Sequence, residues 1–243
     1  MSEYTFKEID QEGLETLKAI SEAKNFNKWM FDTIYPHCEG KILEIGSGIG
    51  NISEYFIENK DQIYLSDLRE NYLEFLEKNF RKTAAGIINL DIVEDNFEKS
   101  NVELLGTFDT VFALNVIEHI HDDGLALKNI YKLLKPGGKV IILVPAYQSL
   151  FNTFDKALEH YRRYTTKSIS KVIETGGFEL VHKTYFNAVG IAGWILSGSI
   201  LKKETIPAGQ MKLYNALVPI FKVVDLAIFK SFGLSAISVG RKN

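Results

Sequence analysis

The fold of this chain is decided by the segment Lys41-Ile-Leu-Glu-Ile-Gly-Ser-Gly-Ile-Gly-Asn51. Residues 41–45 form a short, mostly apolar run typical of a buried strand, and three glycines follow at alternate positions. Glycine lets the backbone turn tightly and lets a ligand approach it closely, and a helix that starts after such a loop presents free N–H groups. The segment therefore predicts a strand, a ligand-binding loop and a helix N-terminus, as in doubly wound nucleotide-binding folds.

Outward from this segment, short apolar runs alternate with stretches of helical spacing. Strands are predicted at 41–45, 62–65, 86–90, 108–114, 139–144, 178–184 and 234–239. Helices are predicted at 51–58 and 70–80, at 122–134 with Asp122 or Asp123 as the N-cap, and from an N-cap at Thr165 or Thr166 to Gly176-Gly177. A turn is predicted at 135–138. Strands joined by single helices need crossover connections, which predicts an α/β fold with a parallel sheet and helices on both faces.

The 243 residues are expected to form one domain, since no linker divides the chain. We predict an N-terminal helical segment at 1–35, a core at 36–185 and 233–243, and a helical insertion or cap at 186–232. Two apolar stretches of helical spacing, 188–201 and 210–229, make up most of the insertion.

The composition excludes several classes of protein. Hydrophobic residues make up 46% and charged residues 24%, values of an ordinary globular chain rather than a disordered one. The net charge of −3 gives no general attraction to nucleic acid, so no nucleic-acid partner is expected. Cys38 is the single cysteine, and the first ten residues lack the basic start and apolar run of a signal peptide. A cytoplasmic location is the expectation.

Three features around the glycine loop narrow the choice of ligand. The glycines stand at 46, 48 and 50, and Asn51 takes the position of the third glycine of the dinucleotide fingerprint. Glu44, two residues before the first glycine, suits a positively charged group and would repel a pyrophosphate. Asp67 ends the second strand and can accept hydrogen bonds from both hydroxyls of a ribose. A ligand with a ribose, a cationic amino-acid portion and no phosphate fits all three features.

Polar residues also follow the next two predicted strands. Asp91 is placed to accept a hydrogen bond from an adenine amino group, with Ile92 beside the ring, and Asn115 follows the fourth strand. In open parallel sheets the ligand binds beyond the carboxyl ends of the strands. We therefore expect one ligand site at the four strand ends that carry Glu44, Asp67, Asp91 and Asn115.

In combination, these residues resemble a known family. The glycine loop with its preceding acid, Asp67, Asp91, the segment 115–119 and the Leu134-Lys-Pro-Gly-Gly138 turn are similar to those of class I S-adenosylmethionine-dependent methyltransferases. The resemblance covers residues 36–185. It implies a Rossmann-like sheet of seven strands whose last strand is antiparallel. It also implies S-adenosylmethionine as cofactor and S-adenosylhomocysteine as product.

The same resemblance assigns the parts of the cofactor. It implies that Glu44 and the glycine loop face the methionine portion, Asp67 the ribose and Asp91 the adenine. The full set of implied cofactor-binding residues is Glu44, Gly46, Ser47, Gly48, Gly50, Asn51, Asp67, Leu68, Asp91, Ile92, Asn115 and Ile117. The segment Asn115-Val-Ile-Glu-His119 is most similar to that of ubiquinone-type O-methyltransferases. Some relatives have a metal-binding glutamate where this chain has Asn115, so no metal is expected.

Three residues are candidates for proton transfer to or from a methyl acceptor. Glu118 and His119 follow the fourth strand at the ligand edge, and histidine titrates in the useful pH range. His119 could instead only shape the pocket. His160 lies in a segment after the fifth strand, where this family often builds acceptor pockets, and is a second candidate base.

Two arginines near His160 leave two interpretations open. Arg162 or Arg163 could hold a carboxylate or phosphate of the acceptor through paired hydrogen bonds. Alternatively, they could pin the loop through salt bridges to Asp155 and Glu159.

The sequence thus predicts an S-adenosylmethionine-dependent methyltransferase that acts by direct displacement on a small-molecule or lipid-linked acceptor, at oxygen. One alternative is a non-catalytic module that binds S-adenosylmethionine, and another is a nucleotide-dependent oxidoreductase. The oligomeric state is not predicted. Residues 188–243 contain seven basic and two acidic residues among apolar helices, which suits peripheral membrane contact through 188–232. An ordinary helical cap over the active site is the other interpretation of that segment.

Overall fold

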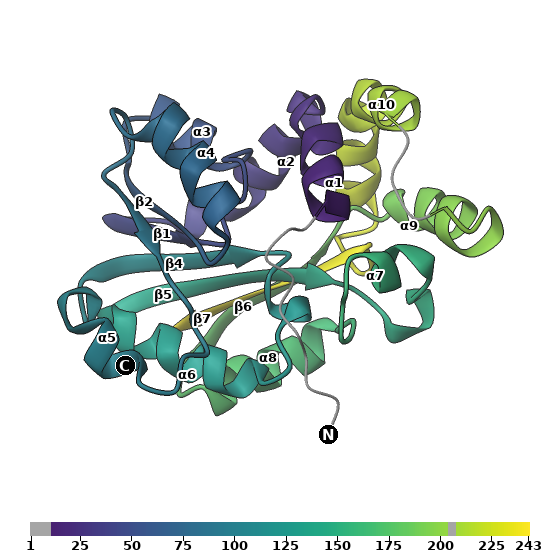
Figure 1. The fold of residues 1–243 in the computed structure, drawn as a ribbon. Helices are drawn as coiled ribbons and strands as arrows, with labels where there is room; N and C mark the ends of the chain where they lie inside the picture. Colours follow the sequence, from purple (N-terminus) through teal and green to yellow (C-terminus); the bar gives the residue numbers. More distant parts are fainter. Residues whose placement is uncertain (1–10, 204–207) are drawn as a thin grey trace.

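The computed structural model describes residues 11–203 and 208–243. Residues 1–10 of the predicted N-terminal segment and residues 204–207 of the predicted insertion therefore lie outside the described part of the chain. Seven strands form one sheet in the order β3-β2-β1-β4-β5-β7-β6 (Figure 1). The strands are β1 (Lys41–Ile45), β2 (Gln62–Asp67), β3 (Gly86–Asn89), β4 (Phe108–Leu114), β5 (Leu134–Pro145), β6 (Glu179–Phe186) and β7 (Ser235–Arg241). β1 to β5 pair in parallel, whereas β7 is antiparallel to both β5 and β6. The expected seven-stranded sheet with an antiparallel last strand is confirmed.

Helices cover both faces of this sheet (Figure 1). The α-helices are α1 (Gln11–Ser21), α2 (Lys24–Ile34), α3 (Ser53–Glu58), α4 (Glu70–Phe80), α5 (Phe97–Ser100), α6 (Asp123–Leu133), α7 (Thr153–Ala157), α8 (Thr166–Thr175), α9 (Gly190–Trp194) and α10 (Ala208–Ala227). A π-helical segment, η5 (Ile195–Ile200), continues α9. Four 3-10 turns connect other elements: η1 (Tyr35–His37), η2 (Val102–Leu104), η3 (Ile117–His119) and η4 (Gln148–Leu150).

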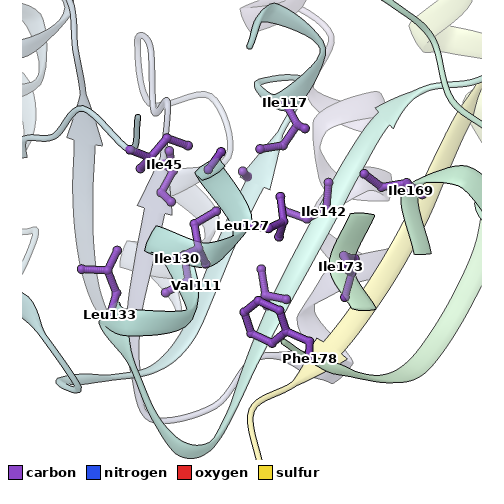
Figure 2. Packing of buried hydrophobic residues seen from close by; sticks show 14 of the residues in the cluster. Ile45, Val111, Ile117, Leu127, Ile130, Leu133, Ile142, Ile169, Ile173 and Phe178 are labelled. Atoms are coloured by element: carbon purple, nitrogen blue, oxygen red, sulfur yellow. The ribbon is translucent and has the colours of Figure 1, made fainter. Parts of the chain in front are cut away.

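Two hydrophobic clusters, one on each face, hold the helices to the sheet. Side chains alternate along a strand, so Val111 of β4 belongs to one cluster and its neighbour Phe112 to the other. Figure 2 shows the first cluster, where Leu127 and Ile130 of α6 and Ile173 of α8 gather against the strands. Each such fully buried side chain stabilises the fold by about 1.5–3 kcal/mol relative to exposure.

The second cluster is aromatic and lies on the opposite face. Trp29 of α2, Phe56 of α3 and Val218 of α10 are among its buried members. The ring centroids of Trp29 and Phe186 are 4.5 Å apart. The predicted N-terminal segment, which contains Trp29, and the start of the predicted insertion at Phe186 therefore share this hydrophobic cluster. α2, α3, α4 and α10 therefore cover one face, and α6 and α8 the other (Figure 1).

Two predicted helices begin at the caps that the sequence indicated. The carboxylate of Asp122 accepts a hydrogen bond from Leu125 N–H at the start of α6. The side chains of Thr165 and Ser168 each accept a hydrogen bond from the other's backbone N–H at the start of α8. Such caps satisfy N–H groups that have no partner within the helix.

The turn predicted at 135–138 is wrong. These residues lie inside β5, which begins at Leu134 and bulges between the pairs Phe108–Leu134 and Thr110–Lys139. Gly137 takes a φ of +83°, which glycine adopts without steric cost, and its N–H donates to Lys242 O. The partner that extends the strand is 105 residues away in the chain, so local turn signals could not reveal it.

Within 11–203 and 208–243, no helix is long and apolar enough to cross a membrane.

Candidate active site

A cavity of about 920 Å³ opens where the carboxyl ends of β1, β2 and β4 meet. Ligand pockets of about 300–1,000 Å³ are typical of small-molecule sites. Residues from α1, the segment 154–163 and the insertion complete the walls. Most of the residues expected to bind the cofactor line this cavity: Glu44, Gly46, Ser47, Gly48, Asn51, Asp67, Leu68, Asp91, Ile92 and Asn115.

The carboxylate of Asp67 connects the loops after β1 and β2. One oxygen accepts a hydrogen bond from Gly48 N–H at 2.9 Å. The other accepts from Leu68 N–H at 2.8 Å and Arg69 N–H at 3.1 Å. Burial raises the pKa of Asp67, and these three backbone donors counter that effect by stabilising the ionised form. The glycine loop is thus fixed against the end of β2.

The carboxylate of Glu44 is buried one strand away. It accepts a short hydrogen bond from the hydroxyl of Ser53, the first residue of α3. Burial raises the pKa of Glu44 to about 7, and the hydrogen bond from Ser53 opposes that shift. A positively charged group in the cavity would stabilise the ionised carboxylate.

Two of the residues expected to bind the cofactor, Gly50 and Ile117, are not among the residues that line the cavity. Gly50 turns the loop with a φ of +80°, and a Cβ on it would lie 2.4 Å from Cε2 of Phe80. Ile117 is fully buried in the cluster that holds α6 and α8. Asn51, which lines the cavity, also donates from its side chain to Leu17 O and so ties the loop to α1.

The three candidate proton-transfer residues meet at the other end of the same cavity. Glu118, His119 and His160 each have one side-chain atom that could bind a metal, and these three atoms lie within 4.8 Å of one another. All three residues line the cavity. The His119 and His160 rings are perpendicular, with centroids 4.6 Å apart. Nε2 of His160 lies 4.0 Å from a Glu118 oxygen.

A second carboxylate orients His160. Nδ1 of His160 is 2.8 Å from Oδ1 of Asp155, and the same oxygen accepts from Nε of Arg163 at 2.7 Å. Burial raises the pKa of Asp155, but His160 and Arg163 outweigh it, so the pKa of this carboxyl lies below its usual value. An ionised Asp155 holds the proton of His160 on Nδ1 and leaves Nε2 as the acceptor that faces Glu118.

Glu118 is as buried as Asp155. It is fully buried, and neither of its carboxylate oxygens has a hydrogen-bond partner within the described part of the chain. Burial raises the pKa of Glu118 to about 8, against the opposing charge of Arg163. Burying an acid without a hydrogen-bond partner lowers the stability of the fold. Such a group is typical of a site where a bound ligand supplies the missing hydrogen bond.

His119 differs from His160 in its surroundings. Burial, and then the neighbouring His160, lower the pKa of His119 to about 3. His119 is therefore neutral throughout the physiological pH range.

The two interpretations of the arginines are separated by the geometry. Arg163 is buried, pairs with Asp155 and donates to Ala146 O at 2.9 Å, so it pins the loop. Arg162 pairs with Asp123 at 3.1 Å, not with the Asp155 or Glu159 that the sequence suggested.

The sequence suggested a helical cap over the active site at 188–232, but it did not single out the residues of α1 and of the insertion that line the cavity. Leu17 and Ile20 of α1 line the cavity, as do Trp194, Met211 and Tyr214 of the insertion. Their apolar helical spacing is equally typical of core residues, so no local signal distinguished them. Asp155 was considered only as a salt-bridge partner, because its contact with His160 requires the turn after α7.

Comparison with known proteins identifies the fold and the domain. Residues 43–142 match the family model described as a methyltransferase domain. The resemblance to S-adenosylmethionine-dependent methyltransferases is confirmed over residues 43–142, which are similar to a methyltransferase domain.

Curated relatives are similar over just over half of the chain. The ubiquinone/menaquinone biosynthesis C-methyltransferase of Haemophilus ducreyi is 29% identical over 140 residues, which is 54% of this chain and 50% of the relative. Phosphoethanolamine N-methyltransferase 1 of Triticum aestivum is 30% identical over 147 residues, 57% of this chain and 28% of the relative. The chain thus spans half or less of the length of these relatives.

Solved structures share the fold over most of the chain. An S-adenosylmethionine-dependent methyltransferase from Archaeoglobus fulgidus matches with a TM-score of 0.60 at 18% identity, covering 90% of this chain and 94% of that one. Phosphoethanolamine N-methyltransferase 2 of Haemonchus contortus, in complex with phosphomonomethylethanolamine and S-adenosylhomocysteine, matches at 0.59 and 21% identity, covering 93% and 56%.

The loop glycine at position 50 should be more sensitive to substitution than a glycine of equal backbone geometry elsewhere. Gly137 has a φ of +83° with open space around it, so Gly137→Ala is expected to cost about 1–2 kcal/mol from backbone strain alone. Gly50→Ala must also displace the Phe80 ring and is expected to cost about 1–3 kcal/mol more. Urea unfolding of both variants measures the difference, and equal losses would contradict this placement of the loop.

Proposed function

We propose that this chain, acting as one domain, transfers a methyl group from S-adenosylmethionine to an oxygen of a small-molecule or lipid-linked acceptor. One observation carries the proposal: a single cavity joins the acids at the ends of β1 and β2 to the Glu118–His160 pair. Bound S-adenosylmethionine would supply an already activated methyl group, and S-adenosylhomocysteine would remain. Alignment of the reactants can supply about 7–11 kcal/mol of the barrier.

The cofactor half of the proposal rests on three carboxylates. Glu44 would hold the cationic amino group of the methionine portion, Asp67 the ribose hydroxyls and Asp91 the adenine amino group. The buried position of Glu44 and the fixed loop at Asp67 support this assignment. The remaining residues expected to bind the cofactor form the surrounding wall.

The acceptor half rests on His160 and Glu118. Nε2 of His160, oriented by Asp155, would take the proton of an acceptor hydroxyl, while the unpaired oxygens of Glu118 would bind the acceptor. General-base catalysis contributes about 10²–10⁴-fold to rates. We favour His160 over His119 as the base, because the low pKa of His119 makes it a poor proton acceptor.

We propose that the reaction needs no metal. Glu118, His119 and His160 could hold an ion, but an acid–base pair would have the same arrangement, with His160 donating a hydrogen bond to Asp155 and facing Glu118. The nearby His121 packs against Tyr161. The cytoplasmic location and the lack of a nucleic-acid partner also stay predictions.

Two assays separate this function from its alternatives. S-adenosylmethionine at about 100 times its dissociation constant should stabilise the protein by about 2.7 kcal/mol, and NAD should not, which distinguishes an oxidoreductase. Release of S-adenosylhomocysteine with an acceptor library, followed by product analysis, distinguishes catalysis from binding and oxygen from nitrogen or carbon transfer. Turnover should survive a metal chelator. Protection by NAD alone, or loss of turnover that a divalent ion restores, would contradict the respective claim.

Cofactor affinity should depend on pH through Glu44. With a pKa of about 7, this carboxyl is protonated at lower pH and cannot pair with a cationic amino group. Affinity is therefore expected to rise from about pH 5.5 to about pH 7.5, by at most about tenfold per pH unit, below the range where an α-amino group titrates. Calorimetry measures this. Glu44→Gln should bind more weakly and lose the dependence; a variant with the same pH profile would show that another group is responsible.

Catalysis should depend on the pairing of His160 with Asp155. His160→Gln is expected to lower kcat by about 10²–10⁴-fold with little change in cofactor affinity, because it removes the base. Asp155→Asn should lower kcat less and shift its pH profile, because His160 loses its orienting charge. His182→Gln is the matched control, since that histidine stacks on His37 away from the cavity. A His160 variant with normal kcat would eliminate it as the base.

A further inference from the structure

We propose that the outer face of the insertion, formed by η5 and α10, docks on a bilayer that carries anionic lipid headgroups. The acceptor would then be a molecule held in that bilayer. The second statement rests on the proposed methyl transfer, whereas the docking does not. Four observations carry the inference: the exposed face of α10, the concentration of exposed apolar side chains, the sign of the surrounding charge and the position of the cavity.

Helix α10 is apolar on both of its sides. Its inner side buries Met211 and Val218. Its outer side carries Leu213, Ile220 and Val223, each about 60% exposed or more. Helices that are apolar all round are found in protein interiors or in contact with lipid, and the residues 11–203 and 208–243 leave the outer side of α10 exposed.

Exposed apolar side chains are concentrated in this part of the molecule. Eight large hydrophobic residues of the described chain are more than half exposed, and seven of them lie between 200 and 229. Phe229, just after α10, is 90% exposed, and Ile200 and Leu201 lie at the end of η5. Val102 is the exception, in η2. Exposed apolar groups gathered in this way mark an interaction site.

The charged side chains that the described residues of the insertion expose are lysines. Residues 188–232 contain five lysines and two acids, Glu204 and Asp225. Asp225 is buried and accepts hydrogen bonds from the backbone N–H groups of Asn187 and Ala188, so it presents no surface charge. Lys202 and Lys212 are exposed beside Leu201 and Leu213. Basic fringes attract anionic lipids and would repel the same face of a second copy, so a bilayer is the better occupant.

The same helices form a wall of the cavity. Trp194, Gln210 and Met211 line it on the inner side, while the apolar residues named above face outward. The Trp194 ring lies 4.4 Å from the guanidinium carbon of Arg163, which holds Asp155 against His160. In Figure 1, α9, η5 and α10 lie together at one side of the molecule. An acceptor held in a docked bilayer would therefore be beside the cavity.

Vesicle sedimentation of the full chain, without cofactor, tests the docking. Vesicles of phosphatidylcholine with about one third phosphatidylglycerol are compared with phosphatidylcholine alone, across a salt series. Binding is expected only to the anionic vesicles. It should weaken as salt rises from about 0.1 M to 1 M, where the screening length falls from about 10 Å to 3 Å.

Variants locate the contact. Ile220→Ser with Phe229→Ser, and separately Lys202→Glu with Lys212→Glu, should each weaken vesicle binding at least tenfold. Val102→Ser is the matched control and should bind as the unaltered chain does, because it is equally exposed but outside the insertion. Calorimetry with S-adenosylmethionine on each variant should show unchanged affinity, which establishes that the variants fold and tests the proposed function independently.

Three outcomes would overturn the proposal. They are no binding to anionic vesicles at low salt, equal loss with Val102→Ser, and a dimer in analytical ultracentrifugation that Ile220→Ser with Phe229→Ser dissociates. The last result would assign the face to a second copy of this chain. Normal cofactor affinity beside any of them would leave the methyltransferase assignment standing.

Discussion

The candidate site depends on the carboxylate of Asp67. Its two oxygens accept backbone N–H groups from Gly48 on one side and from Leu68 and Arg69 on the other. Hydrogen bonds to charged groups each contribute about 1.5–3 kcal/mol. The bond from Gly48 joins the loops that follow two adjacent strands, and the other two fix the carboxylate within the loop after β2. The glycine loop can therefore keep a conformation with positive φ at Gly46, Gly48 and Gly50. A cofactor would meet a surface that is already formed, so less binding energy would be needed to order it.

The opposite end of the cavity is built on a different principle. Asp155 is charged and satisfied, with Arg163, His160 and the Asn152 N–H as partners. Glu118 is buried and unsatisfied, and its raised pKa expresses that cost. The contrast gives two carboxyl groups of opposite tendency on either side of His160. Asp155 orients the imidazole. Glu118 has no hydrogen-bond partner for its carboxylate among the described residues, and a bound molecule could supply one.

Local patterns predicted the parts of the fold whose determinants are close in sequence. α4 was predicted at 70–80 and is found there, and Asp122 and Thr165 cap their helices as expected. The strand-end acids were predictable because parallel strands bring their carboxyl ends to one edge. The start of β5 before Lys139 was not, because Leu134 pairs with Phe108 and Gly137 donates to Lys242 O, both far away in the sequence. The low pKa of His119 also depends on burial, which its position in the sequence does not express.

The central claim is that one cavity holds the cofactor at the strand ends and the reacting atoms beside His160. A crystal structure of the full chain with S-adenosylhomocysteine tests it most directly. We expect the ribose hydroxyls on Asp67, the adenine beside Asp91 and the sulfur directed toward Glu118 and His160. S-adenosylhomocysteine bound outside this cavity, or with its sulfur directed away from His160, would contradict it.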